Sequence, residues 1–325
     1  MDRGGRVKAD NRRHQSGVAL VTAVLIVALA TALAAHVGFR GYLDQRRTAN
    51  QFAFDQGFEF AVGGEAWAAD VLKRDKLTGS PTDDFTEEWA SPLPPIPVDG
   101  GEVSGQIEDM QGRFNLNSLV IAQDGRLRIN EAAVTRFERL LTSLDLEKKW
   151  ARLIVDWIDS DMEGGFPDGA EDDFYTALTP AYHTPNMPIT RTSELLALPG
   201  FGAQRFQRLE PFVAALPVGT RINVCTASPD VLDALIEGAE EFTLARDNVL
   251  EMRKRGCFPS LQDFGKRLDA DQARALNSMV TDHSSFFRAV IRVDIGNTHV
   301  TLYSVLYRPD SSNLVRPYQR SLGVP

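Results

Sequence analysis

Residues 17–39 read GVALVTAVLIVALATALAAHVGF and contain no Asp, Glu, Lys or Arg. From Val18 onward the run supplies about twenty predominantly apolar residues, which is enough for one helix to cross a bilayer. The residues ahead of it are basic, with five Lys or Arg against two Asp. Positive charge on the amino-terminal side of a span keeps that end in the cytoplasm, so we expect the rest of the chain on the opposite side of the membrane.

The residues after the apolar run continue its helical pattern. Residues 40–73 contain no proline, and large apolar side chains recur at helical spacing, as in Phe54, Phe58 and Val62. We therefore expect one long helix over residues 18–75 that crosses the membrane and continues beyond it. A long, partly apolar helix ahead of a globular body is suited to assembly with other subunits.

Three interpretations of the apolar run stay open. A cleaved signal peptide would end in an A-x-A-like site, and the residues up to Ala35 offer such a pattern. A plain signal anchor explains the hydropathy alone. The third rests on the basic leader ending in Gly17, which resembles that of the type IV pilin and pseudopilin family. This resemblance implies that residues 1–17 are a leader peptide, that a prepilin peptidase cuts between Gly17 and Val18, and that the new amino terminus is methylated.

The fifth residue after this cut narrows the resemblance. Most pseudopilins carry a glutamate there, and its carboxylate compensates the amino-terminal charge of a neighbouring subunit inside the apolar filament. This chain has Thr22 instead. Because Thr22 cannot supply that charge, the subunit is best placed at the filament tip, with none above it. Together with the long body downstream, the substitution resembles the minor pseudopilin K family of type II secretion systems.

The composition indicates a chain that can bury a sizeable core. Of its 325 residues, 43% are hydrophobic and 24% charged, so we expect more than one folded unit beyond the membrane helix. The formal net charge is −9, and the leader contributes +3 to it, which leaves −12 on the mature chain. This charge argues against broad nucleic-acid binding. Cys225 and Cys257 are too few for a disulfide scaffold, but outside the cytoplasm they could form one bond, a question that stays open.

Residues 156–175, DWIDSDMEGGFPDGAEDDFY, hold eight carboxylates and no Lys or Arg. A solvated acidic loop is the commonest explanation of such a run. Asp159, Asp161 and Glu163, followed by glycine, look like the start of an EF-hand calcium loop, but Ala170 stands at the twelfth position and no flanking helix pair is indicated. Closely spaced carboxylates nevertheless repel one another unless a cation lies among them, and Ca²⁺ accepts about six to eight oxygen ligands in flexible geometry.

The same stretch matches the D-x-D and GAED-x-x-Y pattern of the pseudopilin K family, in Asp159, Asp161 and the run that ends at Tyr175. Members of that family bind calcium in their globular part, so the resemblance implies a structural Ca²⁺ site here. The candidate metal ligands are Asp159, Asp161, Glu163, Glu171 and Asp172.

Two later stretches resemble helix-hairpin-helix units. The first contains LPGFG at residues 198–202, and in DNA-binding versions such glycines bring backbone N–H groups to a phosphate. The second begins at Arg221 and resembles the helical repeats of membrane-anchored competence DNA receptors, with INVCTAS near its start and RKRGCFPSLQDF near its end. Its hairpin positions, residues 237–241, include three carboxylates, which would repel a phosphate. A membrane-anchored DNA receptor is therefore the competing hypothesis, and we expect the helical fold without DNA binding.

The carboxyl-terminal residues change to a strand pattern. Apolar and polar residues alternate over 286–306, Gly296 and Asn297 indicate a hairpin turn, and residues 315–322 indicate an edge strand. Residues 101–117 favour further short strands and end in QGRFNLN, which resembles a pseudopilin K motif. The prolines between residues 81 and 97 favour a surface connection.

These patterns predict an α+β fold. A long membrane-spanning pilin helix packs on a small antiparallel β-sheet, and a large all-α domain with helix-hairpin-helix or SAM-like units is inserted into that sheet. The expected division is a leader (1–17), the helix (18–75), a first β-region (76–120), the inserted domain (121–282, with units of about 121–217 and 218–282) and carboxyl-terminal strands (283–325).

The sequence indicates no catalytic constellation. The five histidines lack metal-ligand spacing, and no nucleophile elbow, Walker-type loop or dinucleotide fingerprint occurs. We therefore expect a protein that is not an enzyme. The resemblance implies a tip subunit that initiates or caps a pseudopilus and supports secretion of folded proteins across the outer membrane.

The same resemblance implies where the protein lies and what it binds. It would be a single-pass inner-membrane protein of a Gram-negative bacterium with its body in the periplasm. Its expected partners are I- and J-type minor pseudopilins, the major pseudopilin, the prepilin peptidase and the inner-membrane assembly platform. No nucleic acid is expected.

Overall fold

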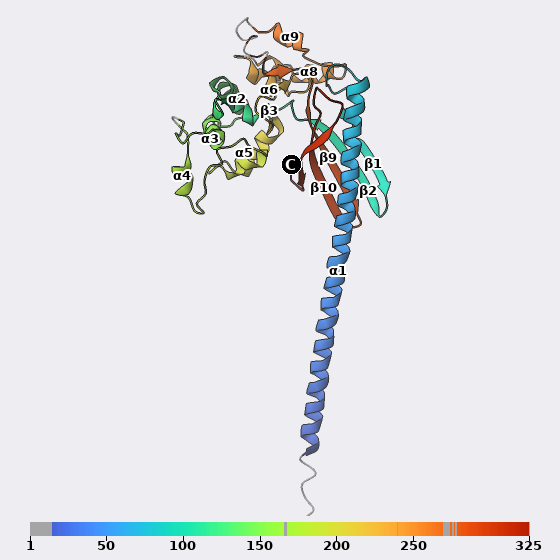
Figure 1. The fold of residues 1–325 in the computed structure, drawn as a ribbon. Helices are drawn as coiled ribbons and strands as arrows, with labels where there is room; N and C mark the ends of the chain where they lie inside the picture. The colour runs from blue at the N-terminus through green and yellow to red at the C-terminus, as the bar shows by residue number, and fades with distance from the viewer. Residues whose placement is uncertain are drawn as a thin grey trace, which may run out of the picture. The chain divides into compact units, whose positions relative to one another are not determined.

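A computed structural model describes residues 15–165, 168–238, 240–268, 274, 276 and 278–324. The chain forms two compact units, Met1–Gln56 and Gly57–Pro325. Most of the expected leader, residues 1–14, and Ala239 of the second expected hairpin lie outside the described residues. The described part of the first unit is helical throughout, and the second unit combines a sheet with many short helices (Figure 1).

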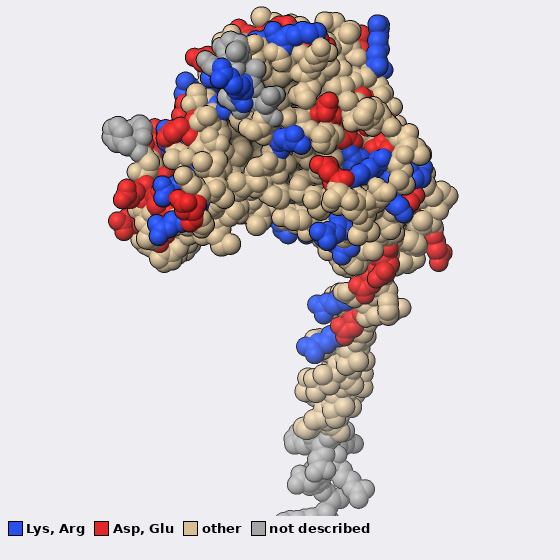
Figure 2. All heavy atoms as spheres, turned by 45° about the horizontal axis from the view of Figure 1, so that its top comes forward, with Lys and Arg blue, Asp and Glu red and all other residues tan. Residues whose placement is uncertain are grey.

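Helix α1 (Gln15–Thr78) begins in the first unit and ends in the second. Within the described ranges it is the one helix long and apolar enough to cross a membrane, with a mean hydropathy of 2.7 in its most apolar window. Figure 2 shows this stretch as uncharged surface, with charged atoms only farther along the helix. The predicted continuation past the apolar run is confirmed, because no proline interrupts the helix.

A five-stranded antiparallel sheet forms one layer of the second unit, with strand order β1-β2-β9-β10-β11. Its strands are β1 (Leu93–Val98), β2 (Gly101–Asp109), β9 (Phe286–Ile295), β10 (Thr298–Tyr307) and β11 (Arg316–Leu322). Strand β2 pairs with β9 although the whole helical part separates them in sequence, so the sheet is split as predicted. The predicted β9–β10 hairpin turn and the edge strand β11 are also confirmed.

The part of α1 in the second unit packs on this sheet through small residues (Figure 1). Gly57, Ala61 and Gly64 follow one another at helical spacing on one face, and Ala61 is fully buried. A Cβ at Gly57 would lie 2.9 Å from Val300 Cγ2, and one at Gly64 would lie 2.7 Å from Ile291 Cγ2. Larger side chains at these positions would therefore push the helix away from the sheet.

A buried carboxylate fixes the same face of α1. Glu65 accepts a hydrogen bond from Ser304 Oγ on β10 at 2.6 Å, and its two oxygens accept from Arg320 Nε and Nη2 on β11 at 2.7 Å each. Burial alone would raise the pKa of Glu65, but the hydrogen bonds from Arg320 and Ser304 and the positive charge of Arg320 lower the pKa below its ordinary value. The ionised pair thus joins the helix to two adjacent strands.

The helical part lies between β2 and β9 in sequence. Its α-helices are α2 (Glu131–Ser143), α3 (Lys149–Ile158), α4 (Asp172–Thr176), α5 (Gly202–Leu209), α6 (Pro229–Leu235), α7 (Glu241–Leu244), α8 (Arg246–Arg253) and α9 (Leu261–Gly265). The 3₁₀-helices are η1 (Glu88–Ala90), which precedes β1, and η2 (Leu116–Leu119), η3 (Thr192–Ala197) and η4 (Glu210–Phe212). Helix α2 is capped by Asn130, whose side chain accepts a hydrogen bond from Ala133 N.

Three short two-stranded ladders accompany these helices. They are β3 (Phe114–Asn115) with β6 (Val213–Ala214), β4 (Val120–Gln123) with β5 (Arg126–Ile129), and β7 (Ile222–Asn223) with β8 (Val280–Thr281). The inserted domain is thus not built of helices alone. Runs of two to four residues are too short for their periodicity to reveal them in the sequence.

Strand β1 was not expected, because its residues, LPPIPV, were predicted to form a surface connection. The three prolines lack a backbone N–H, which excludes them from the interior of a sheet. Here β1 is an edge strand that pairs with β2 alone, and its register shifts between Leu93 and Ile96. The outer side of an edge strand needs no donors, so the prolines are tolerated and also discourage pairing with another chain.

The QGRFNLN motif joins the sheet to the helical part through buried amides. Gln111 Oε1 accepts from Ser285 N at 2.7 Å, at the start of β9. Asn117 is buried, and its side chain bonds both the N–H and the carbonyl of Ile189 and the carbonyl of Leu216, each at 2.8 Å. The motif is therefore structural, because it satisfies backbone groups of segments far apart in the sequence.

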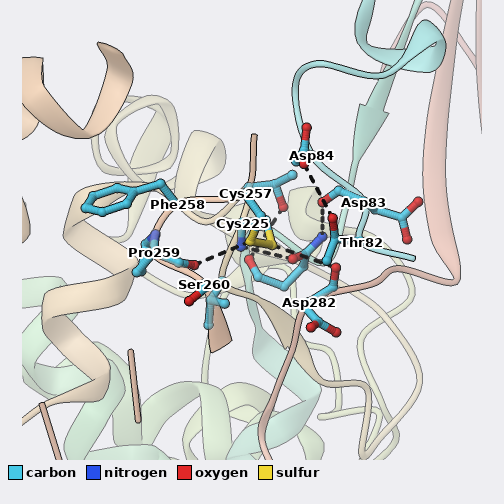
Figure 3. Close-up of a disulfide and its surroundings, with 12 residues drawn as sticks. Thr82, Asp83, Asp84, Cys225, Cys257, Phe258, Pro259, Ser260 and Asp282 are labelled. Carbon is cyan, nitrogen blue, oxygen red and sulfur yellow. Dashed lines mark hydrogen bonds between the residues drawn. A yellow bond between two sulfur atoms is a disulfide. The ribbon is translucent and has the colours of Figure 1, made fainter. Parts of the chain in front are cut away.

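The two cysteines form a disulfide (Figure 3). The Cα atoms of Cys225 and Cys257 are 4.6 Å apart, well inside the range that a disulfide requires. Asp282 lies against the bond, with its carbonyl oxygen 3.7 Å from Cys225 Sγ, and the same carbonyl accepts from Asp83 N at 2.9 Å. The question that the sequence left open is thus answered, because the two cysteines form one disulfide.

Candidate functional site

Three of the carboxylates in the acidic run converge. Asp159 directly follows helix α3, Glu171 directly precedes α4, and Asp161 lies in the loop between them. One oxygen from each of the three lies within 4.8 Å of the others. Two helix ends and a loop therefore bring together three hard oxygen ligands of the kind that Ca²⁺ prefers.

Two of these carboxylates are buried and have oxygens without partners among the described residues. Asp159 is 4% exposed and Glu171 is 8% exposed. Asp159 Oδ1 and both carboxylate oxygens of Glu171 accept no hydrogen bond from the described residues. Buried acceptors are almost always satisfied in native proteins, so such orphaned oxygens call for an unseen ligand.

Their proton affinity reflects the same surroundings. Burial, with the nearby charges of Asp161 and Asp156, raises the pKa of Asp159 to about 7. Burial, with the charges of Asp156 and its other acidic neighbours, raises the pKa of Glu171 to about 8. Ionised carboxylates at this spacing are therefore costly, and a bound cation would remove that cost.

Asp156 shapes the loop rather than the ligand cluster. Its Oδ2 accepts from Ala170 N at 2.7 Å and from Gly165 N at 3.0 Å, which ties the two ends of the loop to α3. A Cβ on Gly169 would lie 2.1 Å from Gly165 N and 2.2 Å from Asp156 Oδ2. Glycine is therefore required at position 169, where the family pattern has it.

Three aromatic rings pack together next to the acidic site. Tyr175 is fully buried, and its ring centroid lies 5.4 Å from that of Trp157 and 5.3 Å from that of Tyr182. Tyr175 OH has no hydrogen-bond partner among the described residues. Burial and the nearby charges of Tyr182, Asp156 and Glu171 raise the pKa of Tyr175, so this aromatic cluster adjoins the acidic site.

The other two candidate ligands lie differently. Glu163 is exposed and outside the cluster, and its N–H donates to Asp161 Oδ1 at 2.9 Å. Asp172 already has partners, since its Oδ1 accepts from Thr184 N at 2.9 Å and its Oδ2 lies 2.8 Å from His183 Nδ1. The hydrogen bonds from His183 and Thr184 lower the pKa of Asp172. The structure thus brings together Asp159, Asp161 and Glu171 and places Glu163 and Asp172 around them.

Asn186 is a member of the site that the sequence did not indicate. Its Oδ1 is buried without a partner among the described residues, and its Nδ2 donates to the Asp161 carbonyl at 3.4 Å. Its φ of +47° is unusual for a residue other than glycine. An isolated asparagine in a proline-rich loop has no charge pattern that could have marked it.

A second carboxylate cluster differs from the first because it contains a cationic side chain, although Glu87 Oε1 is also buried without a hydrogen-bond partner among the described residues. Asp75, Asp83 and Glu87 also offer oxygens within 4.8 Å of one another. Buried Arg308 lies among them, 2.6 Å from Asp75 and in contact with Asp83. No Lys, Arg or His of the described chain makes an ion pair with Asp159, Asp161 or Glu171. Among the described residues, the first cluster thus has no cationic side chain of the kind that Arg308 supplies to the second.

The LPGFG turn does not present free cations for a phosphate. Arg205 on α5, just after the turn, forms two hydrogen bonds with Glu147, at 2.6 and 2.9 Å. Arg208 on the same helix pairs with Asp145 at 3.3 Å. These pairs oppose the DNA-receptor hypothesis, because the arginines nearest the turn are already neutralised.

Comparison with known proteins agrees with this fold. A sequence model described as type II secretion system (T2SS), protein K, matches residues 112–218. A relative named type II secretion system protein K from Pseudomonas aeruginosa is 35% identical over 96% of this chain and 94% of its own length. A relative of the same name from Aeromonas hydrophila is 32% identical over 93% of this chain and 96% of its own.

A solved structure shares the architecture. It comes from the crystal structure of the GspK-GspI-GspJ complex of the enterotoxigenic Escherichia coli type 2 secretion system. The similar chain has a TM-score of 0.71 and 23% identity, and the match covers 86% of this chain and all of that one. At this level of identity the likeness concerns the fold.

A long apolar amino-terminal helix that continues onto a small antiparallel sheet defines a membrane-anchored, pilin-like subunit, a minor pseudopilin. Within that class, the chain belongs to the type II secretion system protein K family. This family is a structural component of the secretion system. The match runs through nearly the whole of both sequences, so it includes the membrane helix, the sheet and the helical part.

Proposed function

We propose that this protein is a non-enzymatic subunit at the tip of a type II secretion pseudopilus, anchored in the inner membrane with its body in the periplasm. The observation that carries the tip position is Thr22. Its hydroxyl donates to the carbonyls of Val18 and Ala19 in its own helix, at 3.0 Å each. Residue 22 therefore offers no negative charge to the amino terminus of a subunit above it, which would be costly to bury unpaired.

Partners follow from the same proposal. The solved relative forms a complex with GspI and GspJ, which supports I- and J-type minor pseudopilins as partners of this chain. The major pseudopilin, the prepilin peptidase and the inner-membrane assembly platform are the further partners we propose. Co-expression with the two small subunits, followed by affinity purification from solubilised membranes, should recover all three together. Recovery of this chain alone, with both small subunits present in the membrane, would contradict the proposal.

Leader removal is part of the proposed assembly route. Cleavage between Gly17 and Val18 should leave a methylated Val18 at the amino terminus, which intact-mass spectrometry of membrane-extracted protein can measure. Gly17→Leu should block cleavage, because a side chain would obstruct the extended backbone in a protease cleft. An intact leader on the wild-type chain, or cleavage near Ala35, would overturn this step.

We also propose that Asp159, Asp161 and Glu171 bind a structural Ca²⁺ ion, with Asn186 Oδ1 as a neutral ligand beside them. The orphaned oxygens of Asp159, Glu171 and Asn186 support this assignment. Glu163 and Asp172 lie close enough in sequence to contribute through small rearrangements or bridging water. Free calcium a hundredfold above its dissociation constant would stabilise the folded state by about 2.7 kcal/mol.

The calcium proposal is tested by thermal unfolding of the full chain in chelator and in calcium. Chelation should lower the melting temperature, and Asp159→Asn with Glu171→Gln should abolish that response. Asp168→Asn is the matched control, because Asp168 is an exposed member of the same acidic run. Identical melting curves of the wild-type chain in excess chelator and in excess calcium would leave this stretch as an ordinary acidic loop.

A further inference from the structure

Three large apolar side chains are exposed around the acidic site. Met162 is 66% exposed, Met187 is 63% exposed and Phe174 is 48% exposed. They come from three segments: the loop after α3, the loop that contains Asn186, and helix α4. None of them takes part in the ligand cluster, and burial in the fold of this chain does not account for them.

The site itself brings these segments together. The Asn186 side chain donates to the Asp161 carbonyl at 3.4 Å, which places the segment of Met187 beside that of Met162. The Asp161 and Glu171 carboxylates lie within 4.8 Å, which places the start of α4 beside the same loop. Figure 1 places α4 on the side of the helical part away from the five-stranded sheet, so the sheet does not cover this surface.

Exposed carboxylates flank the three side chains. Glu163 follows Met162, Asp173 precedes Phe174, and Asp168 lies in the loop between these segments; all three are exposed. The segment 153–190 contains no Lys or Arg. A bound Ca²⁺ would offset charge in the buried cluster but would leave these exposed carboxylates ionised. The exposed apolar side chains would therefore keep an acidic margin, made of carboxylates next to them in sequence.

This combination selects one kind of occupant. An acidic margin repels anionic lipid surfaces and nucleic acid and attracts cationic groups. Methionine side chains are unbranched and polarisable, so a surface that contains two of them adapts to varied apolar partners. An amphipathic segment with large apolar side chains on one face and Lys or Arg at its edges fits both properties.

We propose that Met162, Phe174 and Met187 form a calcium-dependent docking surface for a basic amphipathic segment of another protein. The proposal rests on the calcium site proposed above, because the ion would hold in place the loops and the helix start that carry the three side chains. In the absence of calcium, repulsion among the carboxylates separates these segments, and the apolar surface is no longer continuous.

The test uses the full chain in phosphatidylcholine nanodiscs and a fluorescent amphipathic peptide of leucine and lysine, about five helical turns long. Empty discs provide the background. Fluorescence anisotropy should show binding in calcium that is at least about tenfold tighter than in chelator. Calcium binding is measured on the same sample by isothermal titration calorimetry.

Two sets of variants separate the docking surface from the metal. The first is a triple variant, Met162→Gln with Phe174→Gln and Met187→Gln. It should weaken peptide binding at least about tenfold and retain the heat of calcium binding. Leu244→Gln with Leu314→Gln is the matched control, because both residues are exposed apolar side chains elsewhere, and it should change neither measurement. Asp168→Asn with Asp173→Asn should weaken peptide binding, because it removes the attraction between the acidic margin and the cationic peptide. It should not make peptide binding more sensitive to salt concentration.

The outcomes distinguish the two proposals. Calcium binding without peptide binding, or peptide binding unaffected by the triple variant, would overturn the docking surface and leave the calcium site standing. Equal binding of a matched leucine–glutamate peptide, or of phosphatidylglycerol vesicles, would overturn the choice of a basic segment. If calorimetry shows no heat of calcium binding to the wild-type chain, both proposals are overturned.

Discussion

At the scale of single residues, buried polar side chains hold the second unit together. Asp109 is an example: its Oδ2 accepts from Thr226 Oγ1 at 2.6 Å, Ser284 Oγ at 2.7 Å and Asn223 Nδ2 at 2.9 Å. Asn223 and Thr226 belong to the INVCTAS run, which resembles competence DNA receptors. In this chain that run binds the end of strand β2, so its conspicuous residues have a structural role.

Asn117 offers a direct test of these internal bonds. Asn117→Ala should lower the free energy of unfolding by about 2–4 kcal/mol, because it leaves the backbone groups of Ile189 and Leu216 buried without partners. Urea denaturation of the full chain measures the change. Asn313→Ala, at an exposed position, is the control and should have little effect; equal losses for both variants would contradict the assignment.

The acidic site predicts a pH dependence of stability. The pKa values of Asp159, about 7, and Glu171, about 8, exceed their ordinary values of 3.8 and 4.5. The folded state then binds more protons than the unfolded state, so stability falls as pH rises. In chelator, the contribution of these groups should be fully present below about pH 4 and lost as pH rises towards 8.

Calcium should cancel this trend, because the cation stabilises the ionised carboxylates. Urea denaturation at pH 5 and pH 8, with chelator or with saturating calcium, measures the difference. In the double variant Asp159→Asn with Glu171→Gln, the loss of stability from pH 5 to pH 8 in chelator should be smaller than in the wild-type chain. A wild-type chain equally stable at both pH values in chelator would contradict the geometry of the cluster.

At the scale of elements, the disulfide closes a long stretch of the helical part. Cys225 follows β7, Cys257 precedes α9, and the two are 32 residues apart in sequence. Between them, buried Arg253 on α8 donates to the Ala227 carbonyl at 2.6 Å and the Phe258 carbonyl at 2.7 Å. The covalent bond and the arginine therefore tie the same loop ends together.

Removal of the disulfide should destabilise the body without unfolding the membrane helix. Cys225→Ser with Cys257→Ser should lower the free energy of unfolding by about 3–4 kcal/mol, the loop-closure entropy expected for a loop of this length. Thermal unfolding followed by circular dichroism measures the shift. Treatment of the wild-type chain with reductant should reproduce it, and a shift in the variant but not on reduction would point to packing rather than to the bond.

At the scale of the whole molecule, the two units have different tasks. The described part of the first unit is a helix that is apolar as far as Phe39, with its backbone polar groups satisfied inside the helix, as a membrane requires. The second unit uses part of the same helix as the support for a sheet and its inserted helical part. The chain thus combines a membrane-anchoring helix with a folded body, which is what a filament subunit needs.

Thr22→Glu tests the tip position at this scale. The new carboxylate should compensate the amino terminus of a further subunit, so the pseudopilus should change in length while membrane insertion is retained. Pseudopilus length by electron microscopy and secretion of a reporter protein are the measurements. Thr22→Ser, which adds no charge, is the control. No change in either measurement for Thr22→Glu would remove the charge argument for a tip position.

The sequence by itself determined the parts that depend on local pattern. Uninterrupted hydropathy defined the span, the lack of proline defined the length of α1, and alternation defined β9 and β10. It also marked the acidic run. Each of these follows from neighbours along the chain, whose spacing alone sets which face a side chain occupies.

Only the tertiary structure decided which distant residues meet. It made a proline-rich segment an edge strand of the sheet, joined Cys225 to Cys257, and selected Asp159, Asp161 and Glu171 from five candidate ligands. It also added Asn186, which no charge pattern marked. The physical reason is that a site of this kind depends on how helix ends and loops converge, and that convergence is set by packing of the whole body rather than by sequence spacing.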